Sequence, residues 1–139
     1  MNSRATDSRV VLDREYQGTT ETLRRARTDV CGWLASREFG ADLCERAGLV
    51  LSELASNAVQ AAPGEPYRVR VAIDSDDAVA ITLTSDSPDG RQLPPRALWG
   101  PSSVLAETGR GLLIVDQLSE SVHVQRPMSG QIVVTATLR

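Results

Sequence analysis

An acidic and an amide side chain, Glu53 and Asn57, stand four residues apart in the stretch SELASNAVQAA, residues 52–62. Residues at this spacing share one face of a helix. A carboxylate there can take a proton from an attacking group or orient a water molecule. The amide oxygen is a hard ligand of the kind that Mg²⁺ prefers. The pair therefore has a chemical use if a phosphate-bearing ligand with Mg²⁺ lies beside this helix.

A glycine-containing stretch, TGRGLLIV at residues 108–115, offers a matching place for phosphates. Gly109 and Gly111 carry no side chain, so the backbone can approach an anion closely. If a helix starts here, its unpaired N–H groups point toward that anion, and Arg110 can contact a phosphate. Each motif alone also fits an ordinary surface helix or a simple helix start. Their joint occurrence favours a site for a nucleoside triphosphate together with Mg²⁺.

The composition narrows the class of protein. The chain has 139 residues, 41% of them hydrophobic and 4% aromatic, so we expect one domain with an aliphatic core. A net charge of −3 argues against a direct nucleic-acid partner. No apolar run approaches the roughly 20 residues that span a membrane, and residues 1–8 lack the apolar segment of a signal peptide. We expect a disordered tail over residues 1–8 and a cytoplasmic domain over residues 9–139.

Few residues of the types that bind transition metals or form cross-links are present. Cys31 and Cys44 are the two cysteines, and both fall within helical patterns, where a free thiol behaves as a small hydrophobic group. They have no partners at the spacing of a metal site, and two cysteines are too few for a disulfide scaffold. The single histidine, His123, lies in a strand-like run. We therefore expect no metal site at these residues.

The hydrophobic periodicity predicts which elements hold the motifs. It indicates a strand at 9–16, helices from Glu21 to about Glu38 and from about Asp42 to Ala62, strands at 67–74 and 78–84, a long loop at 85–103, a helix from roughly Gly109 to Leu118, and strands at 121–126 and 131–139. Thr19 or Thr20 is the expected N-cap of the first helix, which should end near Gly40. This order predicts an α+β two-layer sandwich, with a mostly antiparallel mixed sheet and about three helices on one face.

Two stretches of the chain carry a family resemblance. LVLSELASNAVQAA, residues 49–62, resembles the N-box of the GHKL (histidine-kinase-like) ATPase superfamily. ETGRGLLIVDQLSESVHVQ, residues 107–125, resembles the second glycine box of the same superfamily. More narrowly, the chain is similar to the small anti-sigma factor serine kinases of the RsbW and SpoIIAB type that are abundant in actinobacteria. The likeness runs from about Tyr16 to Arg139 and implies the Bergerat fold of these ATPases.

The resemblance implies a role for each matching position. Glu53 would be the general base, Asn57 the Mg²⁺ ligand, residues 109–111 the phosphate-side loop, and residues 90–108 the lid over ATP. The implied partners are a sigma factor, which the protein sequesters, and an antagonist of the STAS-domain type. Many family members phosphorylate a serine or threonine of that antagonist and thereby switch partners. Family members commonly form homodimers.

The adenine-binding position departs from the family pattern. Relatives carry an aspartate at the end of the strand equivalent to 78–84, and its carboxylate accepts a hydrogen bond from the adenine amino group. Ser85 stands at that position here, and Asp86 comes one residue later. A shift of one residue in a strand turns a side chain to the other face, so Asp86 could substitute only if the chain bulges. A lost hydrogen bond to a charged group costs about 1.5–3 kcal/mol.

Two functional hypotheses remain open at this point. The first is an anti-sigma factor with Mg-ATP-dependent serine kinase activity, for which the intact Glu53, Asn57 and glycine motif speak. The second is a degenerate binding module of the same fold, which sequesters its partner without using a nucleotide. Ser85 and the shortage of glycine around it favour this alternative. Both hypotheses predict an anti-sigma role.

Overall fold

The eight elements in the described part of the chain follow the predicted order. The computed structural model describes residues 10–86, 106–126 and 130–139. Its elements are β1 (Val10–Tyr16), α1 (Thr20–Ser36), α2 (Ala41–Ala61), β2 (Tyr67–Ile73), β3 (Val79–Asp86), α3 (Ala106–Leu118), β4 (Ser121–Gln125) and β5 (Gln131–Leu138). The expected tail at 1–8 and most of the expected loop at 85–103 lie outside the described residues.

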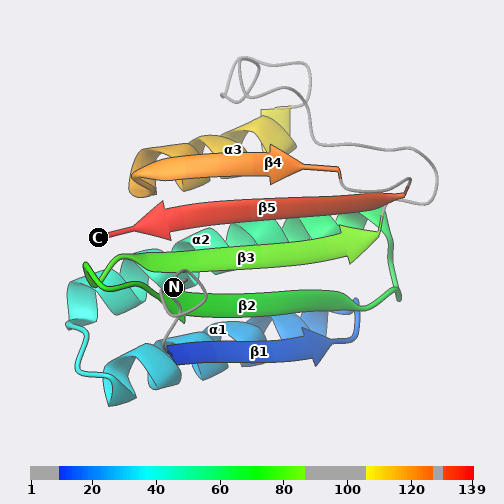
Figure 1. Cartoon of the computed structure of the whole chain (residues 1–139). Coiled ribbons are helices and arrows are strands. Elements are labelled where there is room, and N and C mark those ends of the chain that lie inside the picture. Colours follow the sequence, from blue (N-terminus) through cyan, green and yellow to red (C-terminus); the bar gives the residue numbers. More distant parts are fainter. Residues whose placement is uncertain (1–9, 87–105, 127–129) are drawn as a thin grey trace, which may run out of the picture.

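The described strands form one sheet that the helices cover on a single face (Figure 1). The strand order is β1-β2-β3-β5-β4, and each neighbouring pair is antiparallel. The predicted α+β two-layer sandwich is therefore confirmed. The prediction of a mixed sheet is corrected for the described strands, because the closing hairpin of β4 and β5 joins the sheet beside β3 in antiparallel register.

The hydrophobic core fills the space between the two layers. Alternate residues of β2 and β3 are buried on the helix side, in keeping with the period of two. The buried stripe of α2 packs against them, and α2 lies between α1 and α3 (Figure 1). The large buried side chains are mainly leucine, valine and isoleucine. Because α2 is the central helix, its two flanks face the two neighbouring helices.

The junction of β1 and α1 is held by two tyrosines. The rings of Tyr16 and Tyr67 stack with their centroids 5.6 Å apart. The Tyr16 hydroxyl donates a hydrogen bond of 2.8 Å to Oδ2 of Asp29 on α1. The Tyr67 hydroxyl lies 2.8 Å from Oγ1 of Thr22, also on α1. These contacts tie the first helix to the sheet edge formed by β1 and β2.

Helix α1 ends earlier than the sequence predicted. It stops at Ser36 rather than near Gly40, although Thr19 is its N-cap as expected. Glu38 takes the left-handed backbone conformation, with φ of +70°. The N–H of Phe39 donates to the carbonyl of Leu34 at 3.2 Å, which is the Schellman arrangement of a helix end. The prediction missed this end because glycine usually occupies the left-handed position and a glutamate holds it here.

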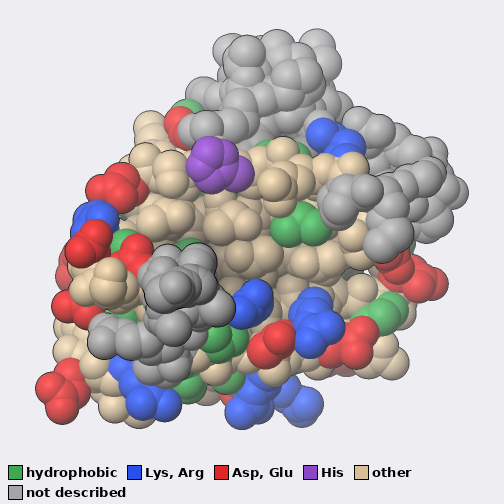
Figure 2. Space-filling view, viewed as in Figure 1, with side chains coloured by type: hydrophobic (Ala, Val, Ile, Leu, Met, Phe, Trp, Pro, Cys, Tyr) green, Lys and Arg blue, Asp and Glu red, His purple; other side chains and the backbone are tan. Residues whose placement is uncertain are grey.

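The face of the sheet opposite the helices is exposed (Figure 2). Charged side chains gather over β1 and β2, where Asp13 accepts two hydrogen bonds from Arg68, at 2.7 and 3.0 Å. Small polar side chains hold the middle, and the hydroxyl oxygens of Thr82 and Thr135 lie 3.1 Å apart. This face carries neither helix α2 nor helix α3, so the motifs singled out in the sequence lie in the other layer.

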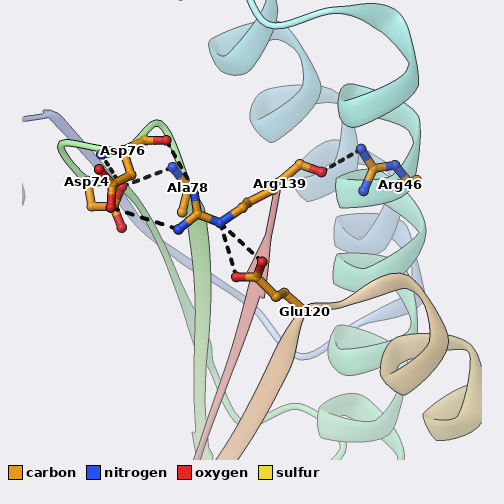
Figure 3. Close-up of polar contacts among 6 residues, drawn as sticks. All are labelled: Arg46, Asp74, Asp76, Ala78, Glu120 and Arg139. Carbon is orange, nitrogen blue, oxygen red and sulfur yellow. Dashed lines mark hydrogen bonds and ion pairs between the residues drawn. The ribbon is translucent and has the colours of Figure 1, made fainter.

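The last residue, Arg139, ties three elements together at one end of the sheet (Figure 3). Its guanidinium pairs with Glu120 at 3.1 Å and with the carboxylate of Asp76 at 3.9 Å. Its carbonyl oxygen accepts a hydrogen bond of 2.9 Å from Arg46 on α2. The contacts join the end of β5 to the β2–β3 turn, to the residue before β4 and to the middle helix.

Candidate functional site

Glu53 and Asn57 lie on the flank of α2 that faces α3. The opposite flank packs on α1, because a Cβ at Gly48 would meet side chains of α1 and the Cys44 carbonyl accepts a hydrogen bond from Cys31. At 100° per residue, Glu53 and Asn57 fall on the side away from Gly48 and Cys44. Both side chains are partly buried. The predicted sharing of one helix face therefore holds in the fold, and α3 is the element beside it.

Ser85 and Asp86 lie in β3, not in the loop predicted over 85–103. The pairing with β5 continues without a bulge through Ser85↔Ile132 and Asp86↔Gln131. Ser85 shares the helix-facing side with Leu83, whereas Asp86 is on the open face and exposed. The regular ladder removes the bulge that Asp86 would need to take the place of the missing aspartate.

Helix α3 begins three residues earlier than predicted, at Ala106 rather than near Gly109. Four N–H groups at the start of a helix have no partner within it, and the described helix contains three residues before Gly109. Gly109, Arg110 and Gly111 therefore lie inside the helix and not at its start. The N–H groups at the start of α3 that could face an anion therefore precede the glycine motif in the sequence.

Three element ends meet at one side of the molecule (Figure 1). The carboxyl end of α2, which carries Asn57, points the same way as the carboxyl end of β3, which carries Ser85. The amino end of α3 lies at this side too, because α3 runs antiparallel to α2 (Figure 1). The fold thus brings an amide, a hydroxyl-bearing strand end and a helix start to a common region.

Comparison with known proteins identifies the family. Residues 16–138 match the family model described as histidine kinase-like ATPase domain. The chain belongs to this family. A search of curated proteins finds no match.

Solved structures share the fold of this histidine kinase-like ATPase domain at low sequence identity. One is the structure of the RsbU and RsbW domains of Rv1364c from Mycobacterium tuberculosis, with a TM-score of 0.70, 18% identity and 94% of the present chain covered. The chain spans 32% of that protein. Another is the SiaB–SiaC complex from Pseudomonas aeruginosa, with a TM-score of 0.66 and 14% identity. The match covers 92% of the present chain and 89% of the matched chain in that complex.

Asn57 provides the test of whether this ATPase-family site fits Mg²⁺ and ATP. Its amide nitrogen is buried and has no hydrogen-bond partner among the described residues. Buried amide N–H groups in native proteins almost always have a partner. An N–H donor suits an anion such as a phosphate oxygen and not a cation, so the unpaired nitrogen fits the phosphate part of such a ligand. Among the described residues, no ion pair neutralises Glu53 either. The amide oxygen of Asn57 is a hard ligand of the kind that Mg²⁺ prefers, and Glu53 is a carboxylate without an ion pair in the described part of the chain. The two residue types therefore fit the roles that the family resemblance implies.

Neither the expected lid nor the single histidine adds a described side chain to this flank of α2. Residues 90–105 of the expected lid lie outside the described part of the chain. Trp33 packs against the core, with the Arg37 guanidinium 5.5 Å from its ring centroid. His123 is exposed on the open face of the sheet (Figure 2). In the described part of the chain, no helix is long and apolar enough to cross a membrane.

Sequence reasoning missed the environment of the cysteines. Both are free and partly buried, but they line an open groove between α1 and α2 instead of being enclosed in the core. The groove lies on the other flank of α2 from Glu53. The sequence could not reveal that Cys31 contacts Cys44, because this contact depends on how α1 packs on α2.

Proposed function

We propose that the protein is a partner-switching anti-sigma factor that binds Mg-ATP and phosphorylates a serine or threonine of a STAS-domain antagonist. The supporting observation is the flank of α2 that carries Glu53 beside Asn57, whose buried amide nitrogen lacks a partner among the described residues and could donate to a phosphate oxygen. The family match supports nucleotide binding in general terms. The protein would act in the cytoplasm, as a homodimer, with a sigma factor as its second partner.

The proposed chemistry assigns one task to each part of the site. Mg²⁺ with ATP would supply a charge-neutralised γ-phosphoryl group. Asn57 would hold the ion through its amide oxygen, and Glu53 would accept the proton of the partner's hydroxyl group. Backbone N–H groups in the first turn of α3 would donate to phosphate oxygens. Ser85 would face the adenine with a hydroxyl in place of a carboxylate.

The solved structures support the partner assignment by analogy of fold. One contains an RsbW domain next to an RsbU domain in a longer chain, and the other is a complex of SiaB with SiaC. Structures that contain this fold thus include a protein complex and a multidomain protein. The net charge of −3 argues against a function that depends on direct contact with nucleic acid.

A second candidate function rests on the regular ladder at Ser85. Since Asp86 is on the open face, the strand supplies no carboxylate on its helix-facing side where adenine would bind. Loss of a charge-assisted hydrogen bond weakens binding by about 10- to 100-fold. A binding module that sequesters its partner without a nucleotide would tolerate this loss.

Calorimetry with Mg-ATP, followed by phosphate transfer from labelled ATP to a cognate STAS-domain protein, distinguishes the two functions. We expect the wild-type protein to bind and to transfer. Glu53→Ala should abolish transfer and leave binding, whereas Glu45→Ala, an exposed acid on the same helix, should change neither. Asn57→Ala should weaken the Mg²⁺-dependent part of binding, with Gln60→Ala on α2 as its control. If the wild type neither binds ATP nor transfers phosphate, the kinase function is wrong and the binding module stands.

A further inference from the structure

The groove between α1 and α2 is a second place in the fold that is lined by reactive side chains. It has a volume of about 860 Å³ and opens to the surface. Its lining includes two arginines, an aromatic ring and both cysteines of the chain: Arg24, Arg27, Phe39, Cys31 and Cys44. The proposed nucleotide site lies on the opposite flank of α2, so that site makes no use of these residues.

The two cysteines contact each other across the groove through the side chain of one and the backbone of the other. Sγ of Cys31 on α1 lies 3.2 Å from the carbonyl oxygen of Cys44 on α2. Sγ of Cys44 lies 3.7 Å from the carbonyl oxygen of Phe39. In Cys44, the side chain and the carbonyl group that Cys31 contacts are both attached to the same Cα atom. The Cys44 side chain must leave its contact with Phe39 before its sulfur atom can bond to that of Cys31.

A close approach of the helices sets this register. A Cβ built on Gly48 would meet Sγ of Cys31 and Nε of Arg27, each at 3.0 Å. The two helices run antiparallel, so residue 27 faces residue 48 and residue 31 faces residue 44. The absence of a side chain at Gly48 lets the backbones come near each other, and a disulfide requires its two Cα atoms to be within about 7 Å.

We propose that Cys31 and Cys44 form a reactive dithiol that a low-molecular-weight disulfide, such as oxidised glutathione, converts into an intramolecular disulfide joining α1 to α2. Arg24 and Arg27 at the groove give it positive charge, which suits the carboxylates of such an oxidant. Disulfides of this kind in reducing compartments are commonly transient and redox-sensing.

The reaction consists of two exchanges. The Cys44 thiolate attacks one sulfur of the oxidant, and the first glutathione leaves as its thiolate. The Cys31 thiolate then attacks the Cys44 sulfur of the mixed disulfide and releases the second glutathione. The two protein thiols lose two protons and two electrons, and the oxidant becomes two reduced thiols. We assign the first attack to Cys44 because the Cys31 sulfur lies against α2, next to Gly48 and the Cys44 carbonyl oxygen, and burial raises the pKa of the Cys31 thiol.

Peptide mapping of the whole protein after treatment with oxidised glutathione tests the proposal. Trypsin cleaves after Arg27, Arg37 and Arg46, so the two cysteines fall in separate peptides, 28–37 and 38–46. We expect the intact mass to fall by two hydrogen atoms and a cross-linked pair of these peptides to appear without reductant. The disulfide closes a loop of about 14 residues, and the oxidised protein should melt higher by on the order of 10 °C. Dithiothreitol should reverse both effects.

Single variants separate the two steps. Cys31→Ser should retain one glutathione on Cys44, because the resolving thiol is missing, and Cys44→Ser should react more slowly than Cys31→Ser. Stable glutathione adducts on the wild-type protein without the cross-linked peptide would overturn the proposal. Covalent dimers on a non-reducing gel in place of the intramolecular product would overturn it equally. Neither outcome depends on whether the protein binds ATP.

Discussion

Ser85 and Asp86 show how a shift of one residue in a strand changes the face of the sheet on which a side chain lies. Both residues are polar, and in the sequence either could act at the adenine position. In the sheet, Ser85 lies on the helix side and Asp86 on the open side, because consecutive residues of β3 alternate and the ladder with β5 continues past both. The side of the sheet, rather than the type of residue, therefore selects Ser85 as the one that can face a nucleotide.

The substitution Ser85→Asp tests that assignment directly. A carboxylate on the helix side should accept a charge-assisted hydrogen bond from adenine and tighten ATP binding by about 10- to 100-fold. Calorimetric titration measures the change. The exchange Asp86→Ser on the open face is the matched control and should leave the affinity as it is. An unchanged affinity of Ser85→Asp would show that position 85 does not contact the base.

Tyr16 gives the stability of the protein a predictable dependence on alkaline pH. Burial, and then the hydrogen bond to Asp29, raise the pKa of Tyr16 above its ordinary value of 10.0. The folded state therefore favours the protonated phenol, so this contribution to stability is complete below pH 10 and is lost as the pH rises above 10 toward the folded-state pKa.

Tyr16→Phe should reveal both effects in urea unfolding experiments. At pH 7 we expect a loss of about 1 kcal/mol in the free energy of unfolding, because the hydrogen bond to Asp29 is removed. Above pH 10 the variant should lose less stability than the wild type. The pKa of Tyr67 is also raised, but Tyr67 is present in both proteins, so the difference between them reports on Tyr16. A variant whose stability falls as steeply as that of the wild type above pH 10 would contradict the assignment to Tyr16.

At the scale of the elements, Gly18 controls how β1 passes into α1. Its carbonyl accepts a hydrogen bond of 2.9 Å from the N–H of Gly64, beside the turn that leads into β2. A Cβ at Gly18 would collide with the backbone oxygen of Glu65. Since the obstacle is backbone, it cannot rotate away as a side chain could. Glycine is needed here for the close approach of two chain segments.

A pair of glycine substitutions tests this requirement. Gly18→Ala should lower the free energy of unfolding by about 2 kcal/mol or more, because the two segments must separate. Gly32→Ala, in the exposed middle of α1 where a Cβ meets nothing within 4 Å, should raise it by about 0.5–1 kcal/mol. Chemical denaturation of the two variants measures both. Equal effects of the two substitutions would show that the contact with Glu65 does not constrain the fold.

At the scale of the whole molecule, Arg139 joins elements that are distant in the sequence. Its guanidinium contacts the β2–β3 turn at Asp76 and the residue before β4, Glu120 (Figure 3). All three side chains are well exposed. Salt therefore screens these ion pairs effectively, and their contribution depends on ionic strength.

Arg139→Ala should lower the melting temperature at low salt, and the difference from the wild type should shrink in high salt. Arg25→Ala removes an exposed arginine of α1 and is the control, because Arg25 has no ion pair with a described residue. Scanning calorimetry at two salt concentrations makes the comparison. A deficit that does not change with salt would mean that packing, and not charge, accounts for the effect of Arg139.

The sequence by itself determined the type and order of the elements and the shared helix face of Glu53 and Asn57. These properties follow from local periodicity, which the backbone geometry of helix and strand imposes on neighbouring residues. The helix ends were predicted less well, since Glu38 holds a position where glycine is usual and α3 starts before its glycines.

Only the tertiary structure decided which surfaces meet. The insertion of β5 between β3 and β4, the packing of α2 between α1 and α3, and the meeting of Cys31 with Cys44 all join residues that no local pattern relates. Such contacts depend on the burial of whole faces and on the pairing of distant strands. Local spacing thus determined what each element carries, while long-range packing determined what each residue faces.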